Sequence, residues 1–330
     1  MICRICKHEK NNKTFQIKEM MFGLRDTFTY FECAQCGCLQ IAEIPEAMDR
    51  YYPASYSAFQ RQFLQGVIIE SVIRRFLRAR RDRYALLNVG AIGQFIHRRY
   101  PNQALTAVRR SGANLNSRIL DVGCNYGAFL FLLRDLGFQY LLGVDPYLDK
   151  EIEHKGVRLL KKTVHDLPPD ERFDLIVANH SFEHIPDQLE TLRSFRRLLS
   201  PDGACFISMP VKTYRIWNMY GVDWVQIDAP RHFFVHTLIS FEHLAQQAGL
   251  AISRVDFDST EFQFWGSEQY KKDIPLHADN SYAINPKKSI FTRRQMRKFR
   301  SAAQELNTIG QGDQATFYLR RKVDGEGTSK

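Results

Sequence analysis

The chain lacks any long apolar run, both at its N-terminus and further along. No stretch of its 330 residues approaches the roughly 20 consecutive apolar residues that a membrane-spanning helix needs. The first residues do not contain the apolar core of a secretory signal. Internal repeats and low-complexity tracts are also missing. We therefore expect a cytoplasmic protein without a transmembrane segment, with one large folded domain or two modest ones.

Acidic residues are outnumbered in this sequence. The 36 Asp and Glu residues face 46 Lys and Arg residues, which gives a formal net charge of +10. This excess favours an anionic partner and does not decide between nucleic acid, an acidic membrane surface and a phosphate-bearing small substrate. Much of it falls in two helical-looking segments, 74–83 and 287–300. Each segment taken alone is interpreted as a solvated charged face.

Cysteine is scarce beyond the first forty residues, because only Cys124 and Cys205 occur in the rest of the chain. The other five crowd the N-terminus at positions 3, 6, 33, 36 and 38. In a reducing compartment such clustering indicates a metal site and not disulfides.

Two Cys-x-x-Cys pairs stand 26 residues apart: Cys3 with Cys6, and Cys33 with Cys36. Four thiolates in two such pairs predict a closed, tetrahedral structural zinc site. Cys38 is a spare thiol that competes with Cys36 as the fourth ligand. Since a closed site does not activate water, we expect Zn²⁺ to fold a small zinc-ribbon-like module over residues 1–45. Direct contact with nucleic acid is the alternative role.

Residues 46–110 are predicted to form a helical linker or lid. Leu64, Ile68 and Val72 recur every four residues, which is the spacing of one helix face. A second helix is expected from Asn88 to about residue 100, where Pro101 stops it.

From residue 118 the pattern alternates between short apolar strands and amphipathic helices. The expected strands lie at 119–122, 141–145, 173–178, 204–209, 252–257 and 315–319, and the expected helices at 128–136, 188–199 and 238–248. The Pro-Asp-Gly segment at 201–203 is expected to form a turn before the fourth of these strands. Repeated strand–helix units imply an α/β fold with a doubly wound, mostly parallel sheet and helices on both faces. We assign this domain to residues 111–330, with an insertion at about 258–312.

The loop after the first strand, residues 121–127, contains Asp-Val-Gly-Cys-Asn-Tyr-Gly. Glycine allows a sharp turn and a close approach to a ligand, and the following helix directs free N–H groups towards that ligand. Asp145 ends the next strand, where a carboxylate accepts hydrogen bonds from ribose hydroxyls. Together these features predict a cofactor that contains adenosine.

Asn125 distinguishes this loop from the dinucleotide fingerprint G-x-G-x-x-G, because it stands where the second glycine belongs. The loop resembles the D-x-G-x-G-x-G motif of class I S-adenosylmethionine-dependent methyltransferases, with Asp121, Gly123 and Gly127 matching. Asn125 departs from that motif, but Asn also tolerates unusual backbone angles. The resemblance implies a Rossmann-like fold and S-adenosyl-L-methionine as the cofactor, held by Asp121, Gly123, Asn125, Gly127 and Asp145.

Other segments carry the same resemblance. The sequence FDLIVANHSFEHIPD at 173–187 looks like the family's fourth strand and its E-H-x-x-D loop, which implies that Asn179 also binds the cofactor. Residues 198–203 look like the turn before its fifth strand. The cysteine module, followed by Gly-Cys-Leu-Gln at 37–40 and by Tyr51 and Tyr52, is similar to the N-terminal segment of bacterial sugar and polysaccharide methyltransferases.

Two histidines are candidates for a general base, which an oxygen or carbon nucleophile needs before it accepts a methyl group. His184 follows one strand and His232 follows another, at the sheet edge where open α/β folds bind ligands. Arg231 is expected to pair with a phosphate or carboxylate of the substrate. Alternatively, His184 only binds the backbone, and His236 is expected to cap the helix that begins near residue 238.

The sequence therefore predicts a methyltransferase that acts on an anionic carbohydrate, such as a nucleotide-linked sugar or a polysaccharide precursor. The basic charge and the zinc module leave RNA open as an alternative substrate. A non-enzymatic zinc-ribbon interaction protein with a degenerate methyltransferase fold is the second alternative, and Asn125 is the only residue that favours it.

Overall fold

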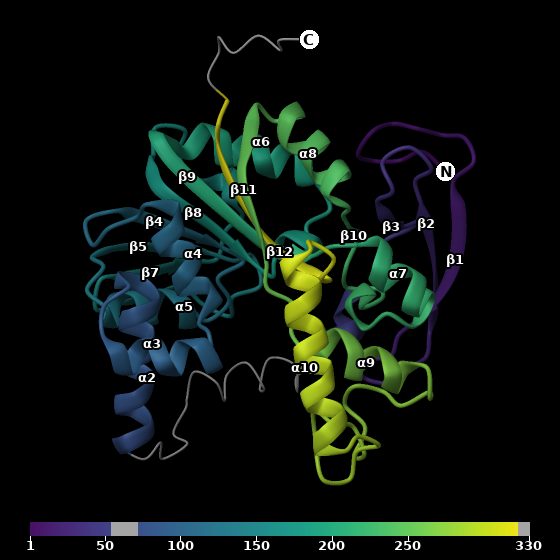
Figure 1. Cartoon of the computed structure of the whole chain (residues 1–330). Helices are drawn as coiled ribbons and strands as arrows, with labels where there is room; N and C mark the ends of the chain where they lie inside the picture. Colours follow the sequence, from purple (N-terminus) through teal and green to yellow (C-terminus); the bar gives the residue numbers. More distant parts are fainter. Residues whose placement is uncertain (54–71, 323–330) are drawn as a thin grey trace.

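An eight-stranded sheet forms the centre of the computed structural model, which describes residues 1–53 and 72–322 (Figure 1). Its strand order is β11-β12-β9-β8-β4-β5-β7-β6. The strands are β4 (Arg118–Val122), β5 (Tyr140–Val144), β6 (Ile152–His154), β7 (Val157–Leu160), β8 (Phe173–Asn179), β9 (Leu199–Pro210), β11 (Leu250–Phe257) and β12 (Gln314–Arg321). β12 runs antiparallel to both of its neighbours and β6 antiparallel to β7, whereas the remaining pairs are parallel. This confirms the predicted α/β fold.

The chain changes direction across the sheet at β4. It first adds β5 and β7 on one side of β4, and then returns to place β8 and β9 on the other side. The loops that follow β4 and β8 therefore leave the sheet at its carboxyl edge, where the order of the strands reverses. Ligands of doubly wound folds bind at such a switch point.

Helices cover both faces of the sheet, and each face has its own apolar core. One core joins Leu105 and Leu130 to the sheet residue Ile119, and the other joins Phe195 and Phe241 to the opposite face. The helices are α2 (Val72–Leu87), α3 (Ala91–Arg99), α4 (Gln103–Ser111) and α5 (Ala128–Asp135) on the first side, and α6 (Gln188–Leu198) and α8 (Leu238–Gln247) on the second.

A second, four-stranded antiparallel sheet contains the N-terminal segment. It is formed by β1 (Lys13–Lys18), β2 (Thr27–Glu32), β3 (Leu39–Ile41) and β10 (Phe234–Val235), in that order. β10 comes from the loop after β9, so the N-terminal strands pair directly with the larger domain. In Figure 1 they lie on the side of the molecule away from α2 and α3.

The insertion near the C-terminus contains two helices, α9 (Phe262–Tyr270) and α10 (Arg293–Thr308). Phe264 stacks on Phe299, which holds α9 against α10. The loop after α9 hydrogen-bonds to the N-terminal segment through Leu276 N–H and the Met20 carbonyl, 2.9 Å apart. The shorter elements are α7 (Tyr214–Tyr220), η1 (Met48–Tyr51), η2 (Val164–Asp166), η3 (Phe182–His184), η4 (Gly221–Asp223) and η5 (Val225–Ile227).

Some details differ from the sequence-based expectations. Residues 201–203 do not form a turn before a strand but lie inside β9. The register shifts there, because Phe173 pairs with Leu199 and Leu175 with Ala204. β6, β7 and α4 were not expected. The helix in the second basic segment begins only at Arg293.

The domain limits at 45/46 and 110/111 stay predictions. Packing connects α4 to the larger domain, since Leu105 and Val108 belong to the same core as Ile119. Leu64 and Ile68, two residues of the expected apolar stripe, lie outside the described residues. Within 1–53 and 72–322, no helix is long and apolar enough to cross a membrane.

Candidate active site and metal centre

In the loop between β4 and α5, every second residue from 123 to 127 has a left-handed backbone conformation. The φ angles are +75° at Gly123, +49° at Asn125 and +76° at Gly127. Glycine adopts such angles without strain, and Asn is among the few other residues that do so readily. The side-chain oxygen of Asn125 also accepts a hydrogen bond from the Tyr126 N–H at 2.8 Å. Asn125 thus fits the backbone conformation of the position where it departs from the glycine motif.

Gly123 also lies against the segment that follows β8. A Cβ atom at Gly123 would stand 2.4 Å from the Cβ of Ser181. The Ser181 hydroxyl donates to the Val122 carbonyl at 2.7 Å. The loop after β4 and the loop after β8 therefore meet at the switch point of the sheet.

Asp145 lies directly after β5 and shapes the glycine loop. One of its carboxylate oxygens accepts from the Asn125 N–H and the other from the Tyr147 N–H, each at 2.9 Å. Asp121 is buried beneath the loop, and burial together with the charge of Asp145 raises the pKa of Asp121 to about 7. Asn179 ends β8 at the same edge and is half-buried. The residues predicted to hold the cofactor thus gather at one edge of the sheet.

The two candidate bases lie side by side. The ring centroids of His184 and His232 are 4.8 Å apart. Nδ1 of His184 lies 2.9 Å from the Arg231 carbonyl, and Nδ1 of His232 lies 2.8 Å from the Gln226 carbonyl. Because a carbonyl oxygen only accepts, Nδ1 carries the proton in both rings. In the neutral form Nε2 therefore keeps the lone pair of each ring.

Glu183 is the site residue that the sequence analysis did not assign, although it lies in the E-H string. Its side chain is almost fully buried, with Oε1 at 3.7 Å from His180 Nδ1 and 3.9 Å from His232 Nε2. Burial alone raises the pKa of Glu183, but the bond to His180 and the nearby imidazoles outweigh it and leave the pKa at about 2. Burial, together with the charge of His232, lowers the pKa of His184.

Arg231 is not available to a substrate, contrary to the sequence-based expectation. Its side chain has no exposed surface and pairs with Glu19 at 3.0 Å and with Asp228. A third hydrogen bond runs to the Tyr51 carbonyl at 3.1 Å. Although burial opposes the charged form, the two carboxylates raise the pKa of Arg231 above its ordinary value. The guanidinium is therefore a structural cation.

The N-terminal segment contacts both histidines. The Tyr30 hydroxyl on β2 donates to the His232 carbonyl at 2.8 Å. The Tyr52 hydroxyl lies 3.3 Å from Nδ1 of His184. Sequence reasoning missed these contacts, because they join residues more than a hundred positions apart. The only signal was the tyrosine pair at 51 and 52.

His236 does not cap α8. Thr237 is the N-cap, and its hydroxyl accepts from the Ser240 N–H. His236 is buried between the Gln188 amide oxygen at 2.8 Å and the Ser240 hydroxyl at 3.0 Å. Burial lowers the pKa of His236 to about 3, so it stays neutral as a core residue.

The four predicted zinc ligands come together in the N-terminal segment. The sulfur atoms of Cys3 and Cys36 are 3.7 Å apart, and those of Cys6 and Cys33 are 3.5 Å apart. All four lie within 4.8 Å of one another. Ligands of a tetrahedral zinc ion are separated by about 3.8 Å, given Zn–S bonds of about 2.3 Å. Cys38 lies outside this set, with its thiol 3.7 Å from the Leu39 carbonyl.

Backbone and side-chain donors surround these sulfur atoms. The Cys6 N–H points to Cys3 Sγ and the Cys36 N–H to Cys33 Sγ, each at 3.5 Å. The Gln40 amide donates to Cys3 Sγ at 3.2 Å. Such donors stabilise thiolates around a metal. The donor set therefore fits Zn²⁺.

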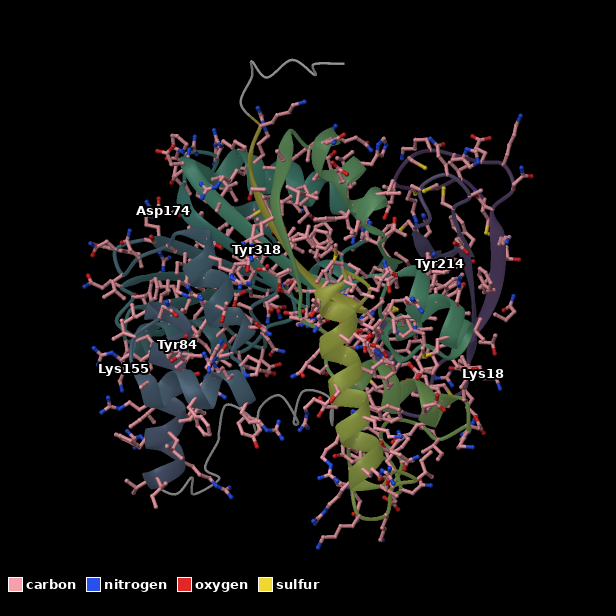
Figure 2. All side chains as sticks on the ribbon, viewed as in Figure 1. Lys18, Tyr84, Lys155, Asp174, Tyr214 and Tyr318 are labelled. Atoms are coloured by element: carbon pink, nitrogen blue, oxygen red, sulfur yellow. The ribbon has the colours of Figure 1, made fainter. Side chains whose placement is uncertain are left out.

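A cavity of about 440 Å³ lies between α4, the ends of β11 and β12, and the end of α10. Its polar lining includes Thr106, Arg110, Asp256, Asp258 and Thr316, and Figure 2 labels Tyr318, which lines it from β12. The Thr316 hydroxyl is 2.7 Å from that of Ser208, whose residue pairs with Asn179 at the end of β8. The cavity floor thus adjoins the edge that carries the site residues.

Comparisons with known proteins agree on one class. Residues 92–255 match a family model described as a methyltransferase domain. The ubiquinone biosynthesis O-methyltransferase of Bradyrhizobium diazoefficiens is 32% identical over 124 residues, which are 34% of this chain and 49% of that protein. The enzyme of the same name from Yersinia enterocolitica is 26% identical over 152 residues, 42% of this chain and 63% of that protein. The matched part thus covers less than two thirds of these relatives.

A solved S-adenosylmethionine-dependent methyltransferase from Mesorhizobium loti aligns with 66% of this chain and 97% of its own, at 18% identity and a TM-score of 0.42. The family match and the strand order observed here lead to the same result. The chain contains a class I, S-adenosylmethionine-dependent methyltransferase domain.

The first prediction concerns the cofactor. Replacing Asp145 by Ala removes the carboxylate predicted to accept from ribose hydroxyls, together with its hydrogen bonds from the Asn125 N–H of the glycine loop and from the Tyr147 N–H. We expect S-adenosylmethionine to bind more weakly by about 1–3 kcal/mol in isothermal calorimetry. Asp170→Ala, which removes an exposed acid far from the loop, should bind like the wild type. Unchanged affinity in folded Asp145→Ala would contradict the assignment.

The second prediction is one zinc ion per chain. Elemental analysis of protein purified without chelator should give one equivalent of zinc, and Cys33→Ser should lose it. Cys38→Ser is the matched control and should retain the zinc, because its sulfur lies outside the four-sulfur cluster. A full zinc content in Cys33→Ser would show that the ligand set is wrong.

Proposed function

We propose that the protein transfers a methyl group from S-adenosylmethionine to a hydroxyl of a carbohydrate. The glycine loop, Asp145 and Asn179 would hold the cofactor at the carboxyl edge of β4, β5 and β8. When bound, this cofactor supplies a methyl group on a positively charged sulfur, and the electron pair of the broken C–S bond stays on the sulfur. Transfer of this kind requires placement and exclusion of water more than covalent help from the protein.

The polar cavity is the observation that supports a carbohydrate. Carboxylates, hydroxyls and amides dominate its lining, and few of its residues are apolar. These groups can bind the many hydroxyls of a sugar, whereas an apolar acceptor would need an apolar pocket. Burial raises the pKa of Asp258, which lies at the cavity wall. Arg110 pairs with Asp256 there, so the wall offers both hydrogen-bond donors and acceptors to sugar hydroxyls.

The cluster of Glu183, His184 and His232 would handle the proton of the acceptor hydroxyl. It adjoins Ser181, which contacts the glycine loop, so it lies next to the proposed cofactor site. In both imidazoles Nε2 is the nitrogen that can accept a proton, because Nδ1 donates its hydrogen to a backbone carbonyl. Zn²⁺ at the four cysteines would stabilise the N-terminal segment, which contacts both histidines.

The test of this function is transfer of labelled methyl groups from S-adenosylmethionine to a panel of acceptors. We expect incorporation into nucleotide-linked sugars or polysaccharide extracts, with little into RNA or into phenols. Weak dependence on salt should accompany a pocket-bound sugar, whereas RNA binding through the exposed arginines of α2 would weaken steeply with salt. Labelling of RNA or phenols alone would contradict the carbohydrate proposal. Absence of S-adenosylmethionine binding would favour a non-enzymatic role.

A further prediction concerns the two histidines. Gln keeps approximate size and some hydrogen bonding but offers no basic nitrogen. We expect His184→Gln and His232→Gln each to lower kcat by about 100-fold or more, with S-adenosylmethionine affinity nearly intact. His165→Gln, a change outside the cluster, should leave kcat unchanged. Near wild-type turnover in both variants would place the chemistry elsewhere.

A further inference from the structure

The side chains of Glu183, His184 and His232 form a three-ligand set in addition to the four cysteines. One carboxylate oxygen and one ring nitrogen from each histidine all lie within 4.8 Å of one another. Within this set, Glu183 Oε1 and His232 Nε2 are 3.9 Å apart. Ligands of a metal ion stand about 3–3.5 Å apart when the bonds are about 2.0–2.2 Å. Small side-chain movements of about 1 Å would therefore close this set around an ion.

Glu183 carries an unexplained atom that points to such a ligand. The side chain is almost fully buried, and its Oε2 has no hydrogen-bond partner among the described residues. A buried, unpaired carboxylate oxygen is costly, because its desolvation is not compensated. A bound cation would supply the missing partner.

The hydrogen bonds around the two histidines are those expected around metal-bound imidazoles. Metal-bound histidines donate their other N–H to a carbonyl or carboxylate, which fixes the ring and frees one nitrogen. Here the carbonyls of Arg231 and Gln226 accept from the two Nδ1 atoms. The Glu183 carboxylate faces imidazoles, with Oε1 at 3.7 Å from His180 Nδ1 and 3.9 Å from His232 Nε2, whereas Arg231 pairs with Glu19 and Asp228.

We propose that Glu183, His184 and His232 bind a divalent transition-metal ion that coordinates the acceptor hydroxyl. Two imidazoles and one carboxylate suit such an ion and leave further coordination positions open. A hydroxyl in an open position loses its proton more easily, because the ion stabilises the alkoxide. Because the histidines are ligands when the ion is bound, the proton passes to solvent and not to an imidazole, and the alkoxide oxygen accepts the methyl group. This inference deepens the proposed function, on which its catalytic part rests, while metal binding itself does not depend on that function.

The test uses the full chain with zinc already bound, titrated with Co²⁺ and followed by calorimetry and visible absorption. We expect one equivalent of Co²⁺ to bind, with d–d absorption, no thiolate charge-transfer band and no release of zinc. Glu183→Gln keeps the side-chain volume, and this variant and His232→Ala should each weaken Co²⁺ binding about tenfold or more. His165→Ala, which removes a histidine outside the cluster, should bind Co²⁺ like the wild type. Zinc content and S-adenosylmethionine affinity check that each variant is folded.

Several outcomes separate this site from the proposed function. Co²⁺ that binds only with a thiolate band, or equally well to folded Glu183→Gln and wild type, would overturn the site. Co²⁺ binding as expected without methyl transfer to any acceptor would leave the site and refute the proposed function. Full turnover by protein that retains zinc but holds no second ion would refute the catalytic role of the ion. Turnover that rises with Co²⁺ occupancy would support both.

Discussion

The buried ion pairs of Arg231 are the interactions on which the packing of the N-terminal segment against the candidate histidines depends. The guanidinium joins Glu19 and the Tyr51 carbonyl of the N-terminal segment to Asp228 at the end of η5. Breaking such a buried pair leaves an uncompensated charge, at a cost of roughly 3–5 kcal/mol. Because His232 directly follows Arg231, this ion network fixes the position of one of the two candidate histidines. The network therefore links the fold of the N-terminal segment to the position of His232.

The cysteine module thus takes part in positioning the site and does not act as an independent appendage. β3 pairs with β10, only two residues after His232. The Tyr30 hydroxyl bonds to the His232 carbonyl, and the Thr237 hydroxyl bonds to the Cys36 carbonyl at 2.7 Å. A closed metal site suits this role, since a rigid cross-link holds distant segments in place without reacting.

The sequence predicted those parts of the molecule that depend on local pattern. Apolar strands, amphipathic helices, the glycine loop and the two Cys-x-x-Cys pairs all have spacings that can be recognised within a few residues. Arg231 was wrongly interpreted as a substrate ligand, because its partner Glu19 lies more than 200 positions away. The roles of Glu183 and Tyr30 were missed for the same reason. β6 and β7 are short, and α4 follows a proline that marks a helix end, so their patterns are weak.

This division between local and long-range structure also separates the two halves of the site. The proposed cofactor site consists of loops that directly follow β4, β5 and β8, and all of it falls within the residues that match the methyltransferase family. The cavity proposed for the acceptor also uses Asp258, Thr316 and the end of α10, which lie beyond residue 255, where that match ends. Residues from the N-terminal segment, also outside the match, hold the histidines. The acceptor named for a relative therefore does not transfer with the domain, because part of the cavity wall proposed to select it here, including Asp258 and Thr316, comes from segments that the family model does not include.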